Sequence, residues 1–503
     1  MALDITLLPD QIPHVERLTQ IFKKSHAAFD MSIMGAGKTF TSTELCKKIG
    51  FPKMIVICPA TMEKKWKLMS KYGVNIDKVI SYQTLRSRKG CEPSHGLLKR
   101  TDSITDEGSN TTTFTPTDLL KDIVAKGCFF VFDEAQNIKN KNDQWSACRA
   151  IANYIVRTPA TISRFLLLSG TPIDKEEHAV NVMSMMGFIR SSKLYMYMKE
   201  EGILKLYGAQ ELIEYCKRIN KEKTEEFLRL NHFEPYNVKH NCYMLFQEIL
   251  KNYITSSMPP PDLPMILDSK NGYYNIMLKE DQENLFKGIN ALNSAARYNE
   301  AAGTAEIKGD NMGSITMALI KIEDAKINTL IRVAKDKLKE IPNCKIAIFV
   351  NYNQSINKLK EAFSEYNPIV LHGSVAKDKR QTLIDEYQRY DLDKRVIIGN
   401  LKVCCTGIDL DDKEGNYPRF AYASPNYMIL DLQQLIYRFR RTDSKSAATF
   451  RFVYGKANRK EVSILNALSK KSKVLKDTLE DQVESGINFP GDYEDEVESE
   501  IEP

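Results

Sequence analysis

A glycine-rich segment near the N-terminus has residue types that can bind phosphates. It runs Ser32-Ile33-Met34-Gly35-Ala36-Gly37-Lys38-Thr39. Glycines let backbone amides wrap a triphosphate, Lys38 can reach the outer phosphates, and the Thr39 hydroxyl can hold Mg²⁺. Ser32 stands where the usual phosphate-loop pattern has its first glycine, so the segment alone is weaker evidence than a full match.

An acidic pair follows about a hundred residues later. It lies in Phe130-Val131-Phe132-Asp133-Glu134-Ala135-Gln136, directly after an apolar run. Asp133, at the end of a buried strand, can hold the same Mg²⁺, and Glu134 can orient or polarise the water that attacks the γ-phosphate. The two segments, in this order, predict that the chain binds and splits ATP.

The elements that must position these residues read as a parallel sheet covered by helices. Short apolar runs alternate with helical patterns. In the first part we expect buried strands at Met54 to Cys58, Val79 to Ser81, Phe129 to Phe132 and Phe165 to Leu168. In a second alternating unit we expect strands at Ile346 to Val350, Ile369 to Leu371, Val396 to Gly399 and Phe450 to Val453.

Three stretches interrupt this alternation. The polar run from Thr101 to Thr117 reads as a mobile surface insertion. The region from Lys193 to Asn299 reads as helical, with helices at Glu211 to Ile219 and Lys221 to Leu230 and a break at the three prolines 259–261. A linker is expected over 301–314, because this stretch contains three glycines.

Composition excludes several classes of protein. The chain has 503 residues, 43% hydrophobic and 27% charged, which is typical of globular domains. No run approaches the roughly 20 apolar residues that span a bilayer. Met1 to Ile5 lacks the features of a signal peptide, so we expect an intracellular protein with no membrane anchor. The ten cysteines form no zinc-type pattern, and we expect reduced thiols and no zinc.

Charge is unevenly distributed along the chain. The net charge is +6, although the last ten residues hold six acidic side chains and no basic one. Basic clusters occur at Lys64-Lys65 with Lys67, at Arg86-Ser87-Arg88-Lys89, and over Lys377 to Arg380. Such clusters suit salt-sensitive, sequence-independent contacts with nucleic-acid phosphates, although a solvated basic face would look the same.

Further motifs resemble one family, the Snf2-like (Swi2/Snf2) ATPases of helicase superfamily 2. In the first half they are Leu8-Pro9-Asp10-Gln11, Cys58-Pro59-Ala60-Thr61 with Trp66, Ser81-Tyr82-Gln83-Thr84-Leu85, Asp133 to Asn140, and Leu168-Ser169-Gly170-Thr171-Pro172-Ile173. In the second half they are Gly407-Ile408-Asp409-Leu410 and Gln434 to Arg441. The likeness runs from about Leu8 to Tyr454.

The resemblance implies an α/β fold with two RecA-like parallel-sheet domains and a helical elaboration between them. We expect a first domain over 1–192, a helical insertion over 193–300, the linker over 301–314, a second domain over 315–475 and an acidic tail over 476–503. The implied activity is a DNA-stimulated ATPase that uses ATP and Mg²⁺ to translocate on double-stranded DNA, with a protein partner for targeting.

The resemblance also implies roles for individual residues. Gln11 would read adenine, and Gly35, Gly37, Lys38, Thr39, Gly407 and Asp409 would contact the nucleotide. Thr61, Ser81 and Tyr82 would touch the tracked strand, beside Lys64 and Lys65. Arg438 and Arg441 lie three residues apart on an expected helix, so both can point at one place and stabilise charge on the transferring phosphoryl group.

Three departures from the family pattern leave alternatives open. Ser32-Ile33 replaces an acidic pair, Gln136 replaces a histidine, and Cys404-Cys405 replaces two glycines. These changes put the coupling between ATP and DNA in doubt. The cysteine pair could be a redox switch or, with better support, packing thiols. The alternatives for the whole chain are a strand-separating or annealing helicase and a DNA-binding subunit with a weakened ATPase.

Overall fold

The computed structural model describes residues 3–104, 110–170, 173–260, 263, 265–299, 304–307, 312–389, 393–405, 408–441, 443–478 and 493–495. The chain forms two compact units. Unit 1 comprises Met1–Pro260 with Val474–Gln482, and unit 2 comprises Pro261–Lys473 with Val483–Pro503.

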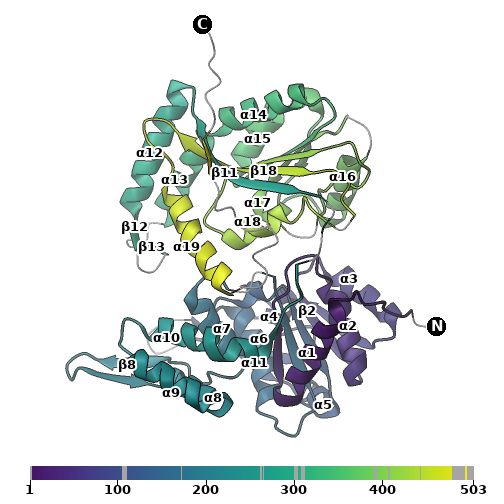
Figure 1. Ribbon diagram of the computed structural model, residues 1–503, viewed down its shortest axis with the longest axis vertical. Helices are drawn as coiled ribbons and strands as arrows, with labels where there is room; N and C mark the ends of the chain where they lie inside the picture. Colours follow the sequence, from purple (N-terminus) through teal and green to yellow (C-terminus); the bar gives the residue numbers. More distant parts are fainter. Residues whose placement is uncertain are drawn as a thin grey trace. The chain divides into compact units, whose positions relative to one another are not determined.

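Unit 1 is built on a parallel sheet (Figure 1). Its strand order is β10-β1-β7-β6-β2-β3, and every pairing is parallel. The strands are β1 (Ala27–Asp30), β2 (Met54–Cys58), β3 (Ile76–Ser81), β6 (Phe129–Asp133), β7 (Arg164–Leu168) and β10 (Thr255–Ser256). The four strands expected in this unit are confirmed, whereas β1 and β10 were not foreseen.

Helices cover this sheet because its strands are apolar on both faces. The helices α1 (Gln11–Lys24), α2 (Lys38–Ile49) and α3 (Glu63–Leu68) share one buried cluster with alternate strand residues, including Leu18, Leu45 and Val131. The intervening strand residues point to the opposite face, where Phe132 and Phe165 meet edge to face. Burial on both faces explains the continuous apolar runs seen in the sequence.

The remaining elements of unit 1 are insertions and helices. The stretch expected as a mobile insertion contains an antiparallel hairpin, β4 (Leu98–Ile104) with β5 (Asn110–Pro116). The helices that follow it are α5 (Asp118–Lys126), α6 (Asp143–Val156) and α7 (Glu176–Met185). A second hairpin, β8 (Tyr195–Met198) with β9 (Ile203–Leu206), groups with α8 (Gly208–Ile219) and α9 (Lys221–Leu230) at one end of unit 1 in Figure 1.

Unit 2 is built on a second parallel sheet, with order β15-β16-β14-β17-β18-β11-β19. Its strands are β11 (Leu267–Asn275), β14 (Lys345–Val350), β15 (Ile369–Leu371), β16 (Val396–Asn400), β17 (Arg419–Ala423), β18 (Ala448–Lys456) and β19 (Tyr493–Asp495). Figure 1 shows α14 (Ile327–Glu340) and α15 (Asn353–Ala362) on one side of this sheet, and α17 (Leu401–Cys404) and α18 (Ile429–Ile436) on the other. The expected fold of two parallel-sheet α/β domains is confirmed.

The boundary between the units differs from the expected one. The helices α10 (Val238–Leu245) and α11 (Lys251–Ile254) end in β10, which joins the sheet of unit 1, and the division falls at Pro260. The strand β10 ends at Ser256, and the prolines that follow at 259 and 260 lack the N–H that a strand needs. The helical region therefore closes before residue 260, and β11 already belongs to unit 2.

The expected linker over 301–314 lies inside unit 2. Its described part includes β13 (Thr304–Ile307), which pairs with β12 (Ala296–Asn299) between the helices α12 (Lys279–Ala295) and α13 (Met312–Asp324). The two helices share one apolar cluster, which includes Leu285 and Ile322. Gly313, the one glycine of this stretch among the described residues, belongs to α13. The C-terminal helix α19 (Ser463–Thr478) extends past 475, and most of the acidic tail lies outside the described residues.

A buried ion pair joins two distant segments of unit 2. Nζ of Lys326 lies 3.0 Å from Oε2 of Glu461, and the two side chains are 1% and 2% exposed. The same ammonium donates to the carbonyl of Val453, and Glu461 also accepts from the amide of Gly455. Burial raises the pKa of Glu461, and the charge of Lys326 opposes that rise.

Lys326→Met should destabilise unit 2, because it leaves a buried carboxylate without its partner. A loss of about 3–5 kcal/mol in the free energy of unfolding is expected. Urea unfolding followed by circular dichroism measures it, since the chain's two tryptophans, Trp66 and Trp145, both lie in unit 1. Lys326→Met combined with Glu461→Gln should recover part of the loss. An unchanged midpoint in the single variant would contradict the role of the pair.

Candidate nucleotide and nucleic-acid site

Apart from Leu8 to Gln11, which leads into α1, the first-half motifs lie where strands of the unit 1 sheet end. The phosphate loop follows β1, Asp133 ends β6, Ser169 follows β7, Thr61 comes shortly after β2, and Ser81 ends β3. Because these strands are parallel, their carboxyl ends meet at one edge of the sheet, the usual ligand edge of such folds. The fold therefore brings together motifs that are spread over more than 130 positions of sequence.

The phosphate loop has the geometry that its glycines predict. Gly35 and Gly37 have φ values of 87° and 88°, which only glycine adopts readily. The helix α2 begins directly at Lys38, so the first amides of this helix face the loop. A Cβ atom at Gly37 would lie 2.4 Å from Nε2 of Gln11, so a larger residue at this position would displace the glutamine.

Gln11 is held against the loop. Its Oε1 accepts from the amide of Leu8 at 2.9 Å, and its Nε2 donates to the carbonyl of Ala36 at 3.0 Å. The glutamine thus bridges the start of the chain and the phosphate loop. Its contact with adenine stays a prediction.

Lys38 folds onto its own loop. Its Nζ donates to the carbonyl of Ser32 at 2.7 Å and to that of Ile33 at 3.0 Å. Thr39, the second residue of α2, is 7% exposed. An ammonium that already binds two oxygen acceptors in the loop is placed to exchange them for phosphate oxygens.

Asp133 is buried and firmly oriented. Its Oδ2 accepts from the indole N–H of Trp66 at 2.7 Å, and its Oδ1 accepts from the amide of Glu134 at 2.9 Å. Burial and the neighbouring Glu134 raise the pKa of Asp133 to about 6, while the Trp66 hydrogen bond and the charge of Lys38 oppose the rise. The Asp133 carboxylate and the Thr39 hydroxyl are hard oxygen donors, which suit Mg²⁺.

Glu134 adopts an unusual backbone conformation for its residue type. Its φ is 55°, in the left-handed region. Its Oε2 accepts from Nε2 of Gln136 at 2.5 Å, and Oε1 of Gln136 accepts from the hydroxyl of Ser169 at 2.6 Å. Gln136 therefore bridges the acidic pair and the segment after β7. The sequence marked Gln136 only as a departure and did not reveal this bridge.

The segment after β7 packs directly on the phosphate loop. A Cβ atom at Gly170 would lie 2.9 Å from the backbone nitrogen of Met34, so only glycine fits there. The next two residues of this motif, Thr171 and Pro172, lie outside the described residues. The contact joins the motif after β7 to the phosphate loop.

The lysine and asparagine that continue the acidic motif form a buried polar cluster. Lys139 donates to Asp174 at 2.8 Å, while His178 lies 2.6 Å from Asp174 and 3.1 Å from Oδ1 of Asn140. Burial raises the pKa of Asp174, but the hydrogen bond from His178 and the charge of Lys139 outweigh it and keep that pKa well below its ordinary value. In this structure these residues join the acidic motif to α7.

The segments expected to meet nucleic acid divide into exposed and buried residues. Thr61, two residues before α3, and Lys64 and Lys65 in its first turn are exposed, whereas Trp66 of the same helix is buried. Ser81 caps α4 (Tyr82–Arg86), where its hydroxyl accepts from the amide of Thr84 at 3.2 Å. Tyr82 is 1% exposed, and its hydroxyl donates to the carbonyl of Asp133 at 2.7 Å. The Tyr82 side chain therefore touches the acidic motif from inside the core.

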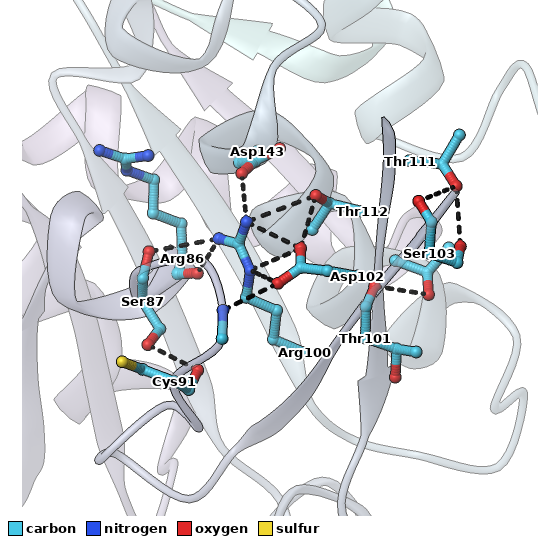
Figure 2. Close-up of polar contacts among 12 residues, drawn as sticks. Arg86, Ser87, Cys91, Arg100, Thr101, Asp102, Ser103, Thr111, Thr112 and Asp143 are labelled. Atoms are coloured by element: carbon cyan, nitrogen blue, oxygen red, sulfur yellow. Dashed lines mark hydrogen bonds and ion pairs between the residues drawn. The ribbon is translucent and has the colours of Figure 1, made fainter. Parts of the chain in front are cut away.

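An arginine in the hairpin holds the basic loop that follows α4 (Figure 2). The guanidinium of Arg100 donates to the carbonyls of Arg86 and Ser87 and lies 2.9 Å from both Asp102 and Asp143. Asp102 in turn accepts from the amide of Gly90. The loop thus has a fixed shape although it is solvent-facing. Nothing in the polar run of sequence singled out Arg100.

The loop of Figure 2 also contains the one exposed thiol. All ten cysteines of the chain fall within the described residues, and only Cys91 is exposed. The Cys404 and Cys405 thiols are buried, and burial raises the pKa of Cys404 to about 12. A Cβ atom at Gly399 would lie 2.4 Å from the Cys404 sulfur, which shows that this thiol packs closely against β16.

In unit 2 the described motif residues contact one another. Arg441 binds Oδ1 of Asp409 through Nε and Nη2, both at 3.0 Å. Burial raises the pKa of Asp409, but the charges of Arg441 and Lys413 outweigh it, so that pKa is lowered. Gly407 lies outside the described residues.

The expected helical placement of the arginine pair is wrong. The helix α18 ends at Ile436, and both arginines follow in the turn beyond it. Arg438 is 6% exposed and donates to the carbonyls of Cys405 and Ile408. Arg441, with 18% of its side chain exposed, is the more accessible of the two. The three-residue spacing matched a helix, but the chain turns away to bring Arg438 onto the loop after α17.

Within the part of the chain that the structure describes, no helix has the length and apolar character needed to cross a bilayer.

Comparison with known proteins supports the resemblance. No protein-family model matches the chain. A protein of Acanthamoeba polyphaga mimivirus named "Putative ATP-dependent RNA helicase" is 24% identical over 469 residues, which cover 92% of this chain and 82% of the relative.

Two solved structures are also similar. A Sulfolobus solfataricus SWI2/SNF2 ATPase core in complex with double-stranded DNA is 16% identical, with a TM-score of 0.32, and the match covers 95% of this chain and 97% of that one. A Sulfolobus solfataricus SWI2/SNF2 ATPase core domain is also 16% identical, with a TM-score of 0.32 and coverage of 90% and 86%.

The motifs, the strand ends that carry them and the long viral match agree with one another. The phosphate loop and the acidic pair share one edge of a parallel sheet in unit 1, and the last two motifs contact each other in unit 2. The chain therefore has two parallel-sheet α/β units and motifs that resemble those of the Snf2-like ATPases of helicase superfamily 2.

Proposed function

We propose that the chain is a DNA-stimulated ATPase that translocates on double-stranded DNA and remodels or displaces proteins bound to it. One observation carries the proposal. Both segments expected to touch the tracked strand hold the same catalytic residue, Asp133, through the Trp66 indole and the Tyr82 hydroxyl. A nucleic-acid strand that binds α3 and α4 would thereby change the position of Asp133, the proposed Mg²⁺ ligand.

The charges on α3 fit this transmission. Lys64 and Lys65 are exposed on the helix that carries Trp66, and the basic loop after α4 is held in shape by Arg100. Phosphate contacts of this kind carry no sequence information, which suits a motor that steps along any sequence. Nucleic-acid binding and hydrolysis would then share two short helices and one carboxylate.

The catalytic roles follow from the positions of the side chains. Lys38 would bind the outer phosphates, Thr39 and Asp133 would hold Mg²⁺, and Glu134, kept in place by Gln136, would orient the attacking water. When bound, the ion would neutralise charge on the phosphates. Arg441, and Arg438 beside it, would stabilise charge on the transferring group.

A second candidate is a strand-separating or annealing helicase that acts on RNA or single strands. The name of the mimivirus relative favours it. The motifs of the two activities are shared, so the choice rests on the nucleic acid that stimulates turnover. We also propose a protein partner for targeting.

Hydrolysis of ATP should rise most with duplex DNA. Turnover would be measured with no nucleic acid, single-stranded DNA, duplex DNA and RNA, at about 50 and 200 mM salt, and stimulation should weaken at the higher salt because it rests on phosphate contacts. Stronger stimulation by RNA or single strands would overturn the duplex proposal in favour of the second candidate.

Glu134→Gln should keep nucleotide binding but lower turnover by about 10²–10⁴-fold.

Trp66→Phe should uncouple the nucleic acid from hydrolysis. It removes the indole donor to Asp133, and a hydrogen bond to a charged group contributes about 1.5–3 kcal/mol, so stimulated turnover should fall about tenfold or more. Nucleic-acid affinity should persist, since Trp66 is buried. Trp145→Phe is the matched control, because that indole donates to the carbonyl of Asn181 instead. Equal losses of basal and stimulated turnover would count against transmission through Trp66.

Arg441→Ala should lower kcat by about 10³-fold, the smaller effect expected for a residue that stabilises the transferring phosphoryl group. Binding of duplex DNA, measured by fluorescence anisotropy, should change little. Arg440→Ala is a neighbouring control, since Arg440 donates to the carbonyl of Leu263. If Arg441→Ala weakened DNA binding as much as turnover, the arginine would be a nucleic-acid contact instead.

A further inference from the structure

A row of four polar side chains, His14, Asp30, Ser32 and Ser256, starts at the first residue of the phosphate loop, and these side chains take no part in the roles described above. His14 on α1 places Nε2 3.0 Å from Oδ2 of Asp30 and Nδ1 2.8 Å from the hydroxyl of Ser256. Asp30 ends β1, and Ser256 ends β10. Oδ1 of Asp30 then accepts from the hydroxyl of Ser32 at 2.5 Å. All four side chains are buried.

The Ser32 hydroxyl donates one hydrogen bond and accepts another. Burial raises the pKa of Asp30, but His14 outweighs it and keeps that pKa below its ordinary value, so the carboxylate is charged and can only accept. The single hydroxyl hydrogen of Ser32 is therefore donated to Asp30. Its oxygen accepts from the backbone amide of Met258 at 2.9 Å. Removing the hydroxyl would leave a buried amide without this acceptor.

Met258 stands at the exit from unit 1. It lies two residues after β10 and is followed by Pro259 and Pro260, where unit 1 ends, and then by Pro261 in unit 2. Consecutive prolines form a stiff, extended segment, because their φ angles are fixed. The two prolines that directly follow Met258, Pro259 and Pro260, therefore have less backbone freedom than other residues to absorb a shift of Met258.

The backbone carbonyl of Ser32 contacts the lysine that is proposed to bind the nucleotide. Its carbonyl accepts from Nζ of Lys38, the ammonium that must turn to the outer phosphates when a nucleotide binds. Departure of Lys38 changes the hydrogen bonding of the residue whose hydroxyl holds Met258. Ser32 thus contacts Lys38 through its carbonyl and Met258 through its hydroxyl. One residue thereby links the lysine of the phosphate loop to the end of unit 1.

We propose that Ser32 is a positioning residue that couples nucleotide occupancy of the phosphate loop to the 255–258 segment, which leads into unit 2. Asp30, which His14 contacts, holds Ser32 in position for this contact. A plain glycine at this position could not make it, which gives a physical reason for the departure of this loop from the usual pattern. The coupling is additional to the proposed track and does not depend on which nucleic acid stimulates turnover.

Hydrogen exchange of the amide of Met258 tests the coupling in the full chain. Exchange would be followed by site-resolved mass spectrometry in wild type, Ser32→Ala and Ser32→Thr, each alone, with Mg·ADP and with a non-hydrolysable ATP analogue. In wild type the exchange rate of this amide should change when nucleotide binds. In Ser32→Ala the amide should exchange about fivefold faster without nucleotide, as expected for loss of a hydrogen bond worth about 1 kcal/mol, and nucleotide should no longer alter the rate. Ser32→Thr, which keeps a hydroxyl, should behave as wild type.

Two controls separate coupling from simple damage to the fold. Binding of a fluorescent ADP shows that each variant is occupied. Ser256→Ala removes the hydroxyl that contacts His14 but leaves the hydrogen bond between Ser32 and Met258 in place, so the Met258 amide should still respond to nucleotide. If Ser32→Ala does not fold, Ser32→Cys replaces it, because a thiol is a weak acceptor. An unchanged nucleotide response in an occupied Ser32→Ala or Ser32→Cys variant would overturn the proposal, as would the absence of any response in occupied wild type.

Discussion

The buried carboxylate of Asp133 is the constraint around which the site of unit 1 is arranged. A charged carboxylate in the core is costly unless donors surround it, and burial already raises the pKa of Asp133 to about 6. The donors that oppose this cost come from other motifs. The Trp66 indole binds the carboxylate, and the Tyr82 hydroxyl binds the carbonyl of the same residue. Satisfying one buried group thereby ties the nucleic-acid segments to the metal-binding residue.

Much of the fold could be read from the sequence, because its signals are local. Central parallel strands are buried on both faces and appear as short apolar runs, so Met54 to Cys58 and Ile369 to Leu371 were foreseen with their exact ends. The two-residue strand β10 has no such signal, since only the neighbouring β1 makes it a strand. The expected linker over 301–314 rested on glycines, which suggest flexibility, whereas the two units divide after Pro260.

In the candidate site, too, some residues could be predicted from the sequence and others only from their contacts. Glycines at 35 and 37 and the acidic pair are recognisable because their chemistry demands those residue types. Partners that act through geometry are not recognisable, and Gln136, Arg100 and His14 emerged only from their contacts. The arginine spacing was misread because three residues match a helical turn as well as the irregular turn that follows α18. The departures from the family pattern at Ser32, Gln136 and Cys404 each have a specific contact in the structure.

The distribution of thiols has a practical consequence. Nine of the ten cysteines are buried, and the exposed one, Cys91, lies at the basic loop that Arg100 holds in shape. Thiol reagents act on accessible thiolates, and burial disfavours the thiolate at the other positions for which a raised pKa is resolved, such as Cys58 and Cys128. A maleimide dye or a cross-linker would therefore attach to the natural sequence at a single point, next to the expected path of the nucleic acid, without any cysteine having to be removed first.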